Sequence, residues 1–175
     1  KFGGDFGVMI TASHNPPCDN GLKVFDRYGV KLCAAKQEKL SQLMDCLPLP
    51  DGHLQRVHEP VFYDIDNIYR DDVIRAVGAR LDGMKVALDC CFGASCRVAG
   101  SVFEAAGAKV CTINDRACGD KINVDCGATH PEVIADFCKE KGIALGFAFD
   151  GDADRCLACD EKGREMDGDK IIALL

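Results

Sequence analysis

The second half of the chain alternates between short apolar runs typical of strands and segments with helical periodicity. The expected order is strand 85–89, helix 95–106, strand 109–113, helix 131–141 and strand 144–149, with a further strand at 156–160. The strands are almost continuously apolar, which is typical of strands buried on both faces. This pattern predicts an α/β fold, in which a parallel sheet is covered by helices on both sides.

The first part of the chain predicts a separate α/β unit. Apolar runs at 7–11 and 22–26 predict two strands, and the spacing of Leu40, Leu43, Met44 and Leu47 predicts a helix over 34–47. An amphipathic helix over 64–81 leads into the second half. We therefore expect two consecutive α/β domains with mixed or parallel sheets, at 1–66 and 67–175, of which the first is incomplete. The chain begins without Met and stops within an apolar run, so we expect a piece of a longer protein.

Composition narrows the function classes. The 175 residues carry a net charge of −7 without a run of basic residues, which disfavours nucleic acid as a partner. No apolar stretch approaches the roughly 20 residues that span a bilayer, so no membrane partner is expected. Most of the 12 cysteines, such as Cys111 and Cys138, stand where a small apolar residue would serve. We therefore interpret them as reduced, buried and structural rather than as disulfides or metal ligands, which favours a cytoplasmic location.

Three aspartates alternate in the segment that follows strand 144–149. Asp150, Asp152 and Asp154 are separated by Gly and Ala, and in a tight turn their carboxylates can face one point. Open α/β sheets bind ligands at the carboxyl ends of their strands, and oxygen donors of this kind suit Mg²⁺. A solvated acidic turn is the alternative. An EF-hand is excluded because Arg155 stands where that loop requires Gly.

Ser13 follows the first strand in the turn Thr11-Ala12-Ser13-His14-Asn15-Pro16. A Gly-x-Ser-x-Gly elbow is absent, which argues against a hydrolase nucleophile. By itself, Ser13 would be read as an ordinary turn residue. Lys23 on the returning strand gives it a chemical context, because a lysine near a phosphorylated serine can balance charge or move a proton.

Together these segments resemble a known superfamily. Residues 11–16, the stretch Asp19-Asn20-Gly21-Leu22-Lys23 and residues 150–155 are similar to the phosphoserine loop, following strand and metal loop of the α-D-phosphohexomutases. The stretch from Ile122 to Glu132 resembles the phosphoglucosamine mutase branch, as do residues 160–163 and 167–169. The resemblance covers nearly the whole chain.

The resemblance implies a reversible mutase that uses phosphorylated Ser13. Its phosphoryl group would pass to a hexosamine phosphate, glucosamine 6-phosphate, and give a bound 1,6-bisphosphate. This intermediate would then return its other phosphate to Ser13 and leave glucosamine 1-phosphate. One Mg²⁺ would be held by Asp150, Asp152, Asp154 and a phosphoserine oxygen. Lys23 is the candidate for proton transfer, and the positions of supporting residues around the phosphoserine match His14, Asn15 and Arg155.

The resemblance leaves alternatives open. Family members have four domains, and this chain resembles the end of the first and most of the second, so we expect it to be inactive without the rest. A homodimer of the full-length protein stays open. The rival interpretations are a phosphomannomutase/phosphoglucomutase, or a metal-binding module without catalysis.

Overall fold

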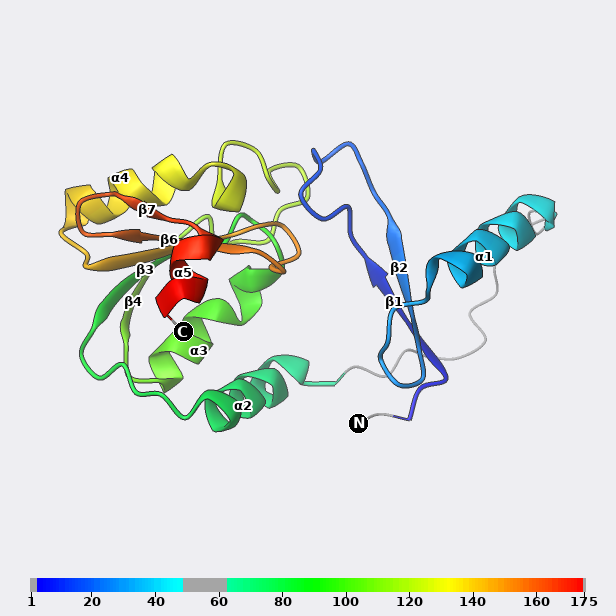
Figure 1. Cartoon of the computed structure of the whole chain (residues 1–175), viewed down its shortest axis with the longest axis horizontal. Coiled ribbons are helices and arrows are strands. Elements are labelled where there is room, and N and C mark those ends of the chain that lie inside the picture. Colours follow the sequence, from blue (N-terminus) through cyan, green and yellow to red (C-terminus); the bar gives the residue numbers. More distant parts are fainter. Residues whose placement is uncertain (1–2, 49–62, 175) are drawn as a thin grey trace. The chain divides into compact units, whose positions relative to one another are not determined.

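The computed structural model describes residues 3–48 and 63–174, and within them two compact units. The first unit comprises the described parts of Lys1–Ile10 and Gly21–Tyr63, and the second those of Thr11–Asn20 and Asp64–Leu175. The turn that carries Ser13 thus belongs to the second unit, although the strands on either side of it belong to the first. Figure 1 shows the elements of both units.

The first unit contains a β-hairpin and a helix. Strands β1 (Phe6–Ile10) and β2 (Leu22–Asp26) pair antiparallel, and helix α1 (Ala34–Cys46) follows. The sequence predicted all three to within a residue or so at each end. The apolar stripe that predicted α1 is nevertheless largely exposed: Leu43, Met44 and Leu47 are all more than half accessible.

The second unit is built on a five-stranded sheet with the order β4-β3-β5-β6-β7. Its strands are β3 (Lys85–Asp89), β4 (Lys109–Ile113), β5 (Leu145–Phe149), β6 (Cys156–Asp160) and β7 (Glu165–Met166). Strands β4, β3 and β5 are parallel, whereas β6 and β7 pair antiparallel. The sheet is therefore mixed, because the short acidic segment between β5 and β6 allows a hairpin but not the crossover that a parallel pair needs.

Helices cover both faces of this sheet, as the sequence predicted. On one face, helix α4 (Pro131–Lys141) packs with Ala87 of β3. On the other face, Val86 and Leu88 of β3 share a hydrophobic core with Ala99 of helix α3 (Ala99–Ala105). Figure 1 shows α4 and α3 on opposite sides of the strands. Burial on both faces explains why β3 is apolar at consecutive positions.

The predicted helices differ from the observed ones mainly at their ends. The helix expected over 64–81 is α2 (Ile65–Val77), which ends because Gly78 adopts a left-handed φ of 63°. The helix expected over 95–106 is divided at Val98 into the 3₁₀ turn η1 (Ala94–Arg97) and α3. A short final helix, α5 (Gly168–Leu174), follows β7.

The cysteines are only partly core residues. All twelve are free thiols, and five of them are buried: Cys90, Cys91, Cys126, Cys138 and Cys159. The prediction of burial is correct for Cys138 but wrong for Cys111, which is exposed. Cys111 lies on β4, the edge strand of the sheet, where fewer neighbours cover the side chains.

Candidate active site

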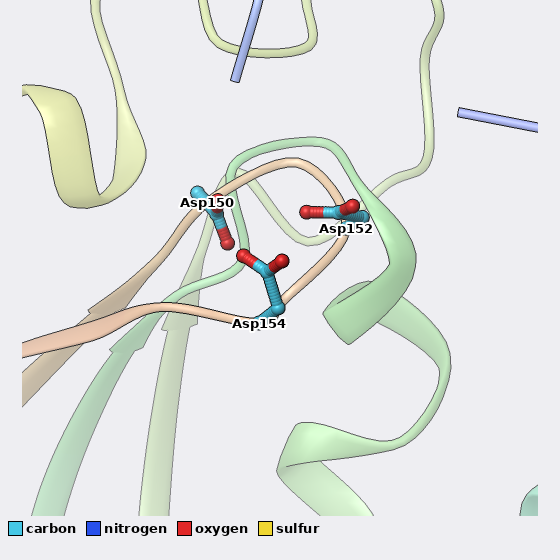
Figure 2. A group of neighbouring side chains, drawn as sticks. All are labelled: Asp150, Asp152 and Asp154. Carbon is cyan, nitrogen blue, oxygen red and sulfur yellow. The ribbon is translucent and has the colours of Figure 1, made fainter. Parts of the chain in front are cut away.

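The three aspartates lie in the turn between β5 and β6, at the carboxyl end of the parallel strands. A bond from the Ala153 amide to the Asp150 carbonyl (3.0 Å) closes the turn, and Ala153 takes a left-handed φ of 59°. One carboxylate oxygen from each of Asp150, Asp152 and Asp154 lies within 4.8 Å of the other two. Figure 2 shows the three groups facing the space inside the turn. Such a set of hard oxygen donors could hold a divalent cation.

Asp150 is the buried member of the trio, with no exposed surface. Its carboxylate accepts hydrogen bonds from the Arg155 backbone N–H (3.1 Å) and from Arg155 Nε (2.9 Å). Arg155 Nε also lies 3.9 Å from Asp154. A buried carboxylate needs a compensating charge, and the Arg155 guanidinium supplies it through its hydrogen bond to Asp150. Three carboxylates therefore stand in this turn beside one arginine.

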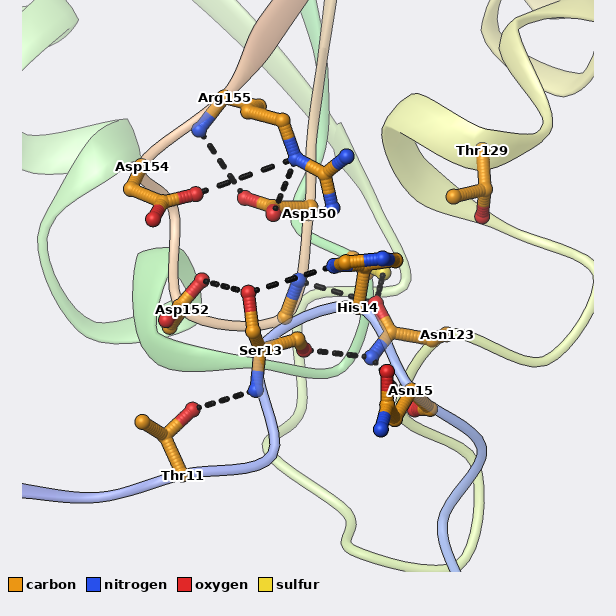
Figure 3. A network of polar contacts seen from close by, with 12 residues as sticks. Thr11, Ser13, His14, Asn15, Asn123, Thr129, Asp150, Asp152, Asp154 and Arg155 are labelled. Carbon is orange, nitrogen blue, oxygen red and sulfur yellow. Dashed lines mark hydrogen bonds and ion pairs between the residues drawn. The ribbon is translucent and has the colours of Figure 1, made fainter. Parts of the chain in front are cut away.

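The turn carrying Ser13 lies directly against this acidic turn. The Ser13 hydroxyl donates to an Asp152 carboxylate oxygen at 3.3 Å, and His14 Nδ1 lies 3.4 Å from the same hydroxyl (Figure 3). Ser13 has a φ of 57°, which is uncommon for a residue with a side chain. The Thr11 hydroxyl accepts from the Ser13 backbone N–H at 2.9 Å and helps to hold this conformation. The structure therefore brings Ser13, His14 and the acidic trio together.

Asn15 and Lys23 are placed differently from Ser13. The Asn15 side chain donates to Asp19 (3.0 Å), within its own turn, whereas the Asn15 backbone carbonyl accepts from Asn123 Nδ2 (3.1 Å). Lys23 lies on β2 opposite Met9, in the first unit, so its assignment rests on the sequence and remains a prediction.

Asn123 joins the two turns, although nothing in the sequence pattern singles it out. Its Nδ2 donates to the backbone carbonyls of Ser13 (2.9 Å) and Asn15 (3.1 Å), while its Oδ1 accepts from the Gly151 backbone N–H (3.0 Å). No spacing rule could have found this contact, because Asn123 and Ser13 are 110 positions apart. The only signal was that Asn tolerates the left-handed backbone it adopts here, with a φ of 60°.

Asp89 is a second residue that the sequence pattern did not single out. It ends β3 fully buried, and its carboxylate accepts from the backbone N–H groups of Cys91 (2.9 Å) and Gly127 (2.8 Å) and from Asn114 Nδ2 (3.0 Å). These donors come from three different loops. Asp89 therefore fixes the loops beneath the site, which include the segment that carries Asn123.

Two glycines allow the loops to approach this closely. A Cβ on Gly93 would lie 2.3 Å from the Gly151 carbonyl oxygen, and a Cβ on Gly151 would lie 2.7 Å from the Ser13 carbonyl oxygen. Both distances are too short for any side chain. Gly93 belongs to the loop before η1. This loop supports the acidic turn through the hydrogen bond from the Ala94 N–H to the Gly151 carbonyl (2.9 Å).

Comparison with family models decides the relationship. Residues 1–47 match the model for phosphoglucomutase/phosphomannomutase, alpha/beta/alpha domain I, and residues 65–163 match the model for domain II. The chain belongs to this family. The α/β architecture of the second unit is accordingly that of a phosphohexomutase domain.

Curated relatives in this family narrow the comparison. A phosphoglucosamine mutase of Moorella thermoacetica is 45% identical over 99% of this chain and 40% of its own length. The phosphoglucosamine mutase of Clostridium acetobutylicum is 42% identical, again over 99% of this chain and 40% of the relative. The chain thus spans about two fifths of the length of these phosphohexomutases.

Solved structures show the same fold. A phosphoglucomutase/phosphomannomutase family protein of Burkholderia thailandensis superposes with a TM-score of 0.70 at 26% identity, over 92% of this chain and 34% of the other. An Aspergillus fumigatus N-acetylphosphoglucosamine mutase, solved with GlcNAc-6P and magnesium, gives a TM-score of 0.62 at 23% identity, over 99% of this chain and 47% of the other. The second similarity concerns the fold alone.

Every helix within residues 3–48 and 63–174 is too short or too polar to cross a membrane.

Proposed function

We propose that the protein to which this chain belongs is a phosphoglucosamine mutase, interconverting glucosamine 6-phosphate and glucosamine 1-phosphate. One observation carries the proposal: the Ser13 hydroxyl lies 3.3 Å from Asp152, within a trio of carboxylates whose donor atoms are mutually within 4.8 Å. Phosphoryl transfer needs a group that carries the phosphate and a counter-charge beside it, and this turn pair supplies candidates for both. The curated relatives, at 42–45% identity, favour glucosamine phosphates as substrates.

The proposed reaction uses Ser13 as a reversible phosphate carrier. The C1 hydroxyl of glucosamine 6-phosphate attacks the phosphorus on Ser13, the bond from phosphorus to Ser13 Oγ breaks, and the hydroxyl proton leaves to a base. In the return step the bisphosphate turns over and Ser13 Oγ attacks the phosphorus at C6. The bond from that phosphorus to the C6 oxygen breaks, the base returns its proton to the C6 oxygen, and the sugar leaves as glucosamine 1-phosphate. Lys23 remains the sequence-based candidate for proton transfer. His14 Nδ1, 3.4 Å from Ser13 Oγ, is the ring nitrogen that the structure places near the hydroxyl.

The donor set fits one Mg²⁺. All three side chains offer carboxylate oxygens, which Mg²⁺ prefers, and a divalent cation between them would reduce the repulsion between these neighbouring carboxylates. Asp150, Asp152, Asp154 and the phosphate on Ser13 would hold the ion. When bound, it would offset the negative charge on the phosphoryl group. Arg155 keeps the buried Asp150 oriented in either case.

The proposal is tested first by phosphorylation of Ser13 and then by the activity of the full-length protein. Intact-mass analysis should find one phosphate on the chain, and Ser13→Ala should abolish it. Full-length protein should interconvert glucosamine phosphates in preference to glucose or mannose phosphates, whereas the isolated 175 residues should not turn over. Preference for glucose or mannose phosphates would instead support the phosphomannomutase/phosphoglucomutase alternative. Absence of phosphate and of turnover in the full-length protein would favour a non-catalytic metal-binding module.

A further inference from the structure

Asn123 uses its whole hydrogen-bonding capacity between two loops that are distant in sequence. Both Nδ2 protons are directed to carbonyl oxygens of the Ser13 turn, and Oδ1 accepts from the Gly151 N–H and from the Cys91 thiol (3.2 Å). Rotating the amide by half a turn would set its oxygen against two carbonyls and its NH₂ against an N–H. These partners therefore allow a single orientation of the Asn123 amide. With that orientation, Asn123 connects the Ser13 turn to the acidic turn (Figure 3).

Asn123 is itself held in place from below. It lies in a coil of turns closed by bonds from the Ile122 N–H to the Cys118 carbonyl (3.0 Å) and from the Val124 N–H to the Lys121 carbonyl (3.1 Å). Four residues later, the Gly127 N–H is bound to the buried Asp89 carboxylate (2.8 Å). Because its base is fixed, the amide acts as a clamp on the Ser13 turn.

The Ser13 turn needs such a clamp most when it carries phosphate. The unmodified hydroxyl donates a hydrogen bond to Asp152. Phosphorylation removes that donor and adds a charge of about −1.5 to −2 beside the acidic trio. A direct attraction thus becomes a repulsion, while both bonds from Asn123 to backbone carbonyls are unaffected by the modification. The left-handed φ of 57° at Ser13 is a further reason for the turn to relax if it is released.

From this geometry we propose that Asn123 is a positioning residue for phosphoryl transfer. It holds the Ser13 turn against the acidic turn and keeps the phosphoserine in reach of the cation site despite their like charges. The proposal rests on the proposed function, in that Ser13 is taken as the phosphate carrier. Asn123 acts through the backbone of Ser13 and Asn15 and is not itself a catalytic residue.

The test uses the full 175-residue chain with serine or phosphoserine installed at position 13. Asn123→Gly removes the amide but keeps a backbone that adopts positive φ without strain. Asn114→Gly is the matched control: Asn114 also has a positive φ of 51°, and its amide binds Asp89 rather than the Ser13 turn. Two quantities are measured, namely hydrogen exchange of residues 11–20 against that of β3 and β5, and Mg²⁺ affinity by calorimetry.

In the phosphorylated chain, Asn123→Gly should speed exchange in residues 11–20 by about tenfold or more, since two hydrogen bonds are lost, and leave β3 and β5 protected. Its Mg²⁺ affinity should fall to that of the unphosphorylated chain. Asn114→Gly weakens the Asp89 network but keeps both hydrogen bonds from Asn123 to the Ser13 turn, so it should lower the melting temperature and change both quantities far less than Asn123→Gly does. Unchanged exchange and unchanged affinity in Asn123→Gly would overturn the clamp. If that variant loses its circular dichroism, Asn123→Asp replaces it, because the near-isosteric carboxylate retains the acceptor for Gly151 and lacks both donors.

The two proposals fail in different ways. If phosphorylation of Ser13 does not tighten Mg²⁺ binding in the unsubstituted chain, the phosphoserine is not a ligand and the proposed site is wrong. Hydrogen exchange in the unphosphorylated chain would still test the clamp, with faster exchange in residues 11–20 expected for Asn123→Gly. If phosphorylation does tighten Mg²⁺ binding and Asn123→Gly preserves the gain, the site stands and the clamp is refuted.

Discussion

Gly151 offers a direct way to separate the two turns without altering a polar group. A Cβ at this position would lie 2.7 Å from the Ser13 carbonyl oxygen, 2.8 Å from Asn123 Nδ2 and 3.0 Å from Ile122 Cδ1. The φ of Gly151 is not in the left-handed region, so alanine introduces no backbone strain there. The clash falls on groups that join the two turns, and we expect Gly151→Ala to release the Ser13 turn rather than unfold the domain.

The magnitude follows from these distances. Ser13 O would have to retreat by about 0.7 Å to reach 3.4 Å, the lower end of ordinary contact. The same shift, directed away from Asn123, would lengthen its 2.9 Å bond beyond the range of a hydrogen bond. Overpacking of this kind typically costs about 1–3 kcal/mol, which corresponds to a shift of about 5- to 150-fold in the docking equilibrium of the turn.

Hydrogen exchange of residues 11–20 measures this shift, and thermal unfolding measures the stability of the domain. Gly100→Ala is the control, because its Cβ would meet only Thr112 Cγ2, at 3.8 Å, and alanine in a helix should be neutral or mildly stabilising. Gly93→Ala sets the opposite limit, since its Cβ would lie 2.3 Å from the backbone of the acidic turn and should lower the melting temperature. Unchanged exchange in Gly151→Ala, with an unchanged melting temperature, would refute the close docking of the two turns.

Two further predictions concern charge. Asp152→Asn should weaken Mg²⁺ binding by roughly tenfold or more and leave the melting temperature nearly unchanged, because Asp152 lies in a loop with little core packing; equal affinities by calorimetry would contradict the cation site. Burial raises the pKa of the Cys126 and Cys138 thiols from 9.0 to about 12, so the folded state retains protons that the unfolded state loses above about pH 9. Unfolding free energy measured in urea should therefore fall as pH rises from about 9 towards 12, and Cys138→Ala should flatten that decline.

The fold was predictable because its signals are local. Strand β3 and helix α4 match their predicted bounds at both ends. The apolar run of β3 involves only neighbouring residues, and α4 begins at Pro131 and ends before Gly142, two residues that commonly mark helix ends. The errors arose where tertiary context decides. Cys111 looked like a core residue but lies on the edge strand β4, and nothing in its immediate neighbours shows that β4 ends the sheet.

Only some residues of the candidate site could be predicted from the sequence. The acidic trio and Ser13 stand out because their chemistry is concentrated in a few adjacent residues. Asn123 and Asp89 do not stand out, because their importance comes from hydrogen bonds to backbone groups that are far away in the sequence. A backbone carbonyl carries no residue identity, so a side chain that recognises one leaves no pattern in the partner segment.

Backbone strain at the site connects these observations. Ser13, Asn123 and Ala153 all have a positive φ, one in each of the three segments that meet there. Such conformations are unfavourable for residues with side chains, and they persist when surrounding contacts impose them. Here the contacts are those from Thr11, Asn123 and the Asp150 carbonyl, and they link the three segments or close their turns. Ser13 and Ala153 are thus held mainly by bonds within their own turns, and Asn123 supplies the hydrogen bonds that join one turn to the other, so loss of Asn123 should loosen the Ser13 turn before it disturbs the sheet.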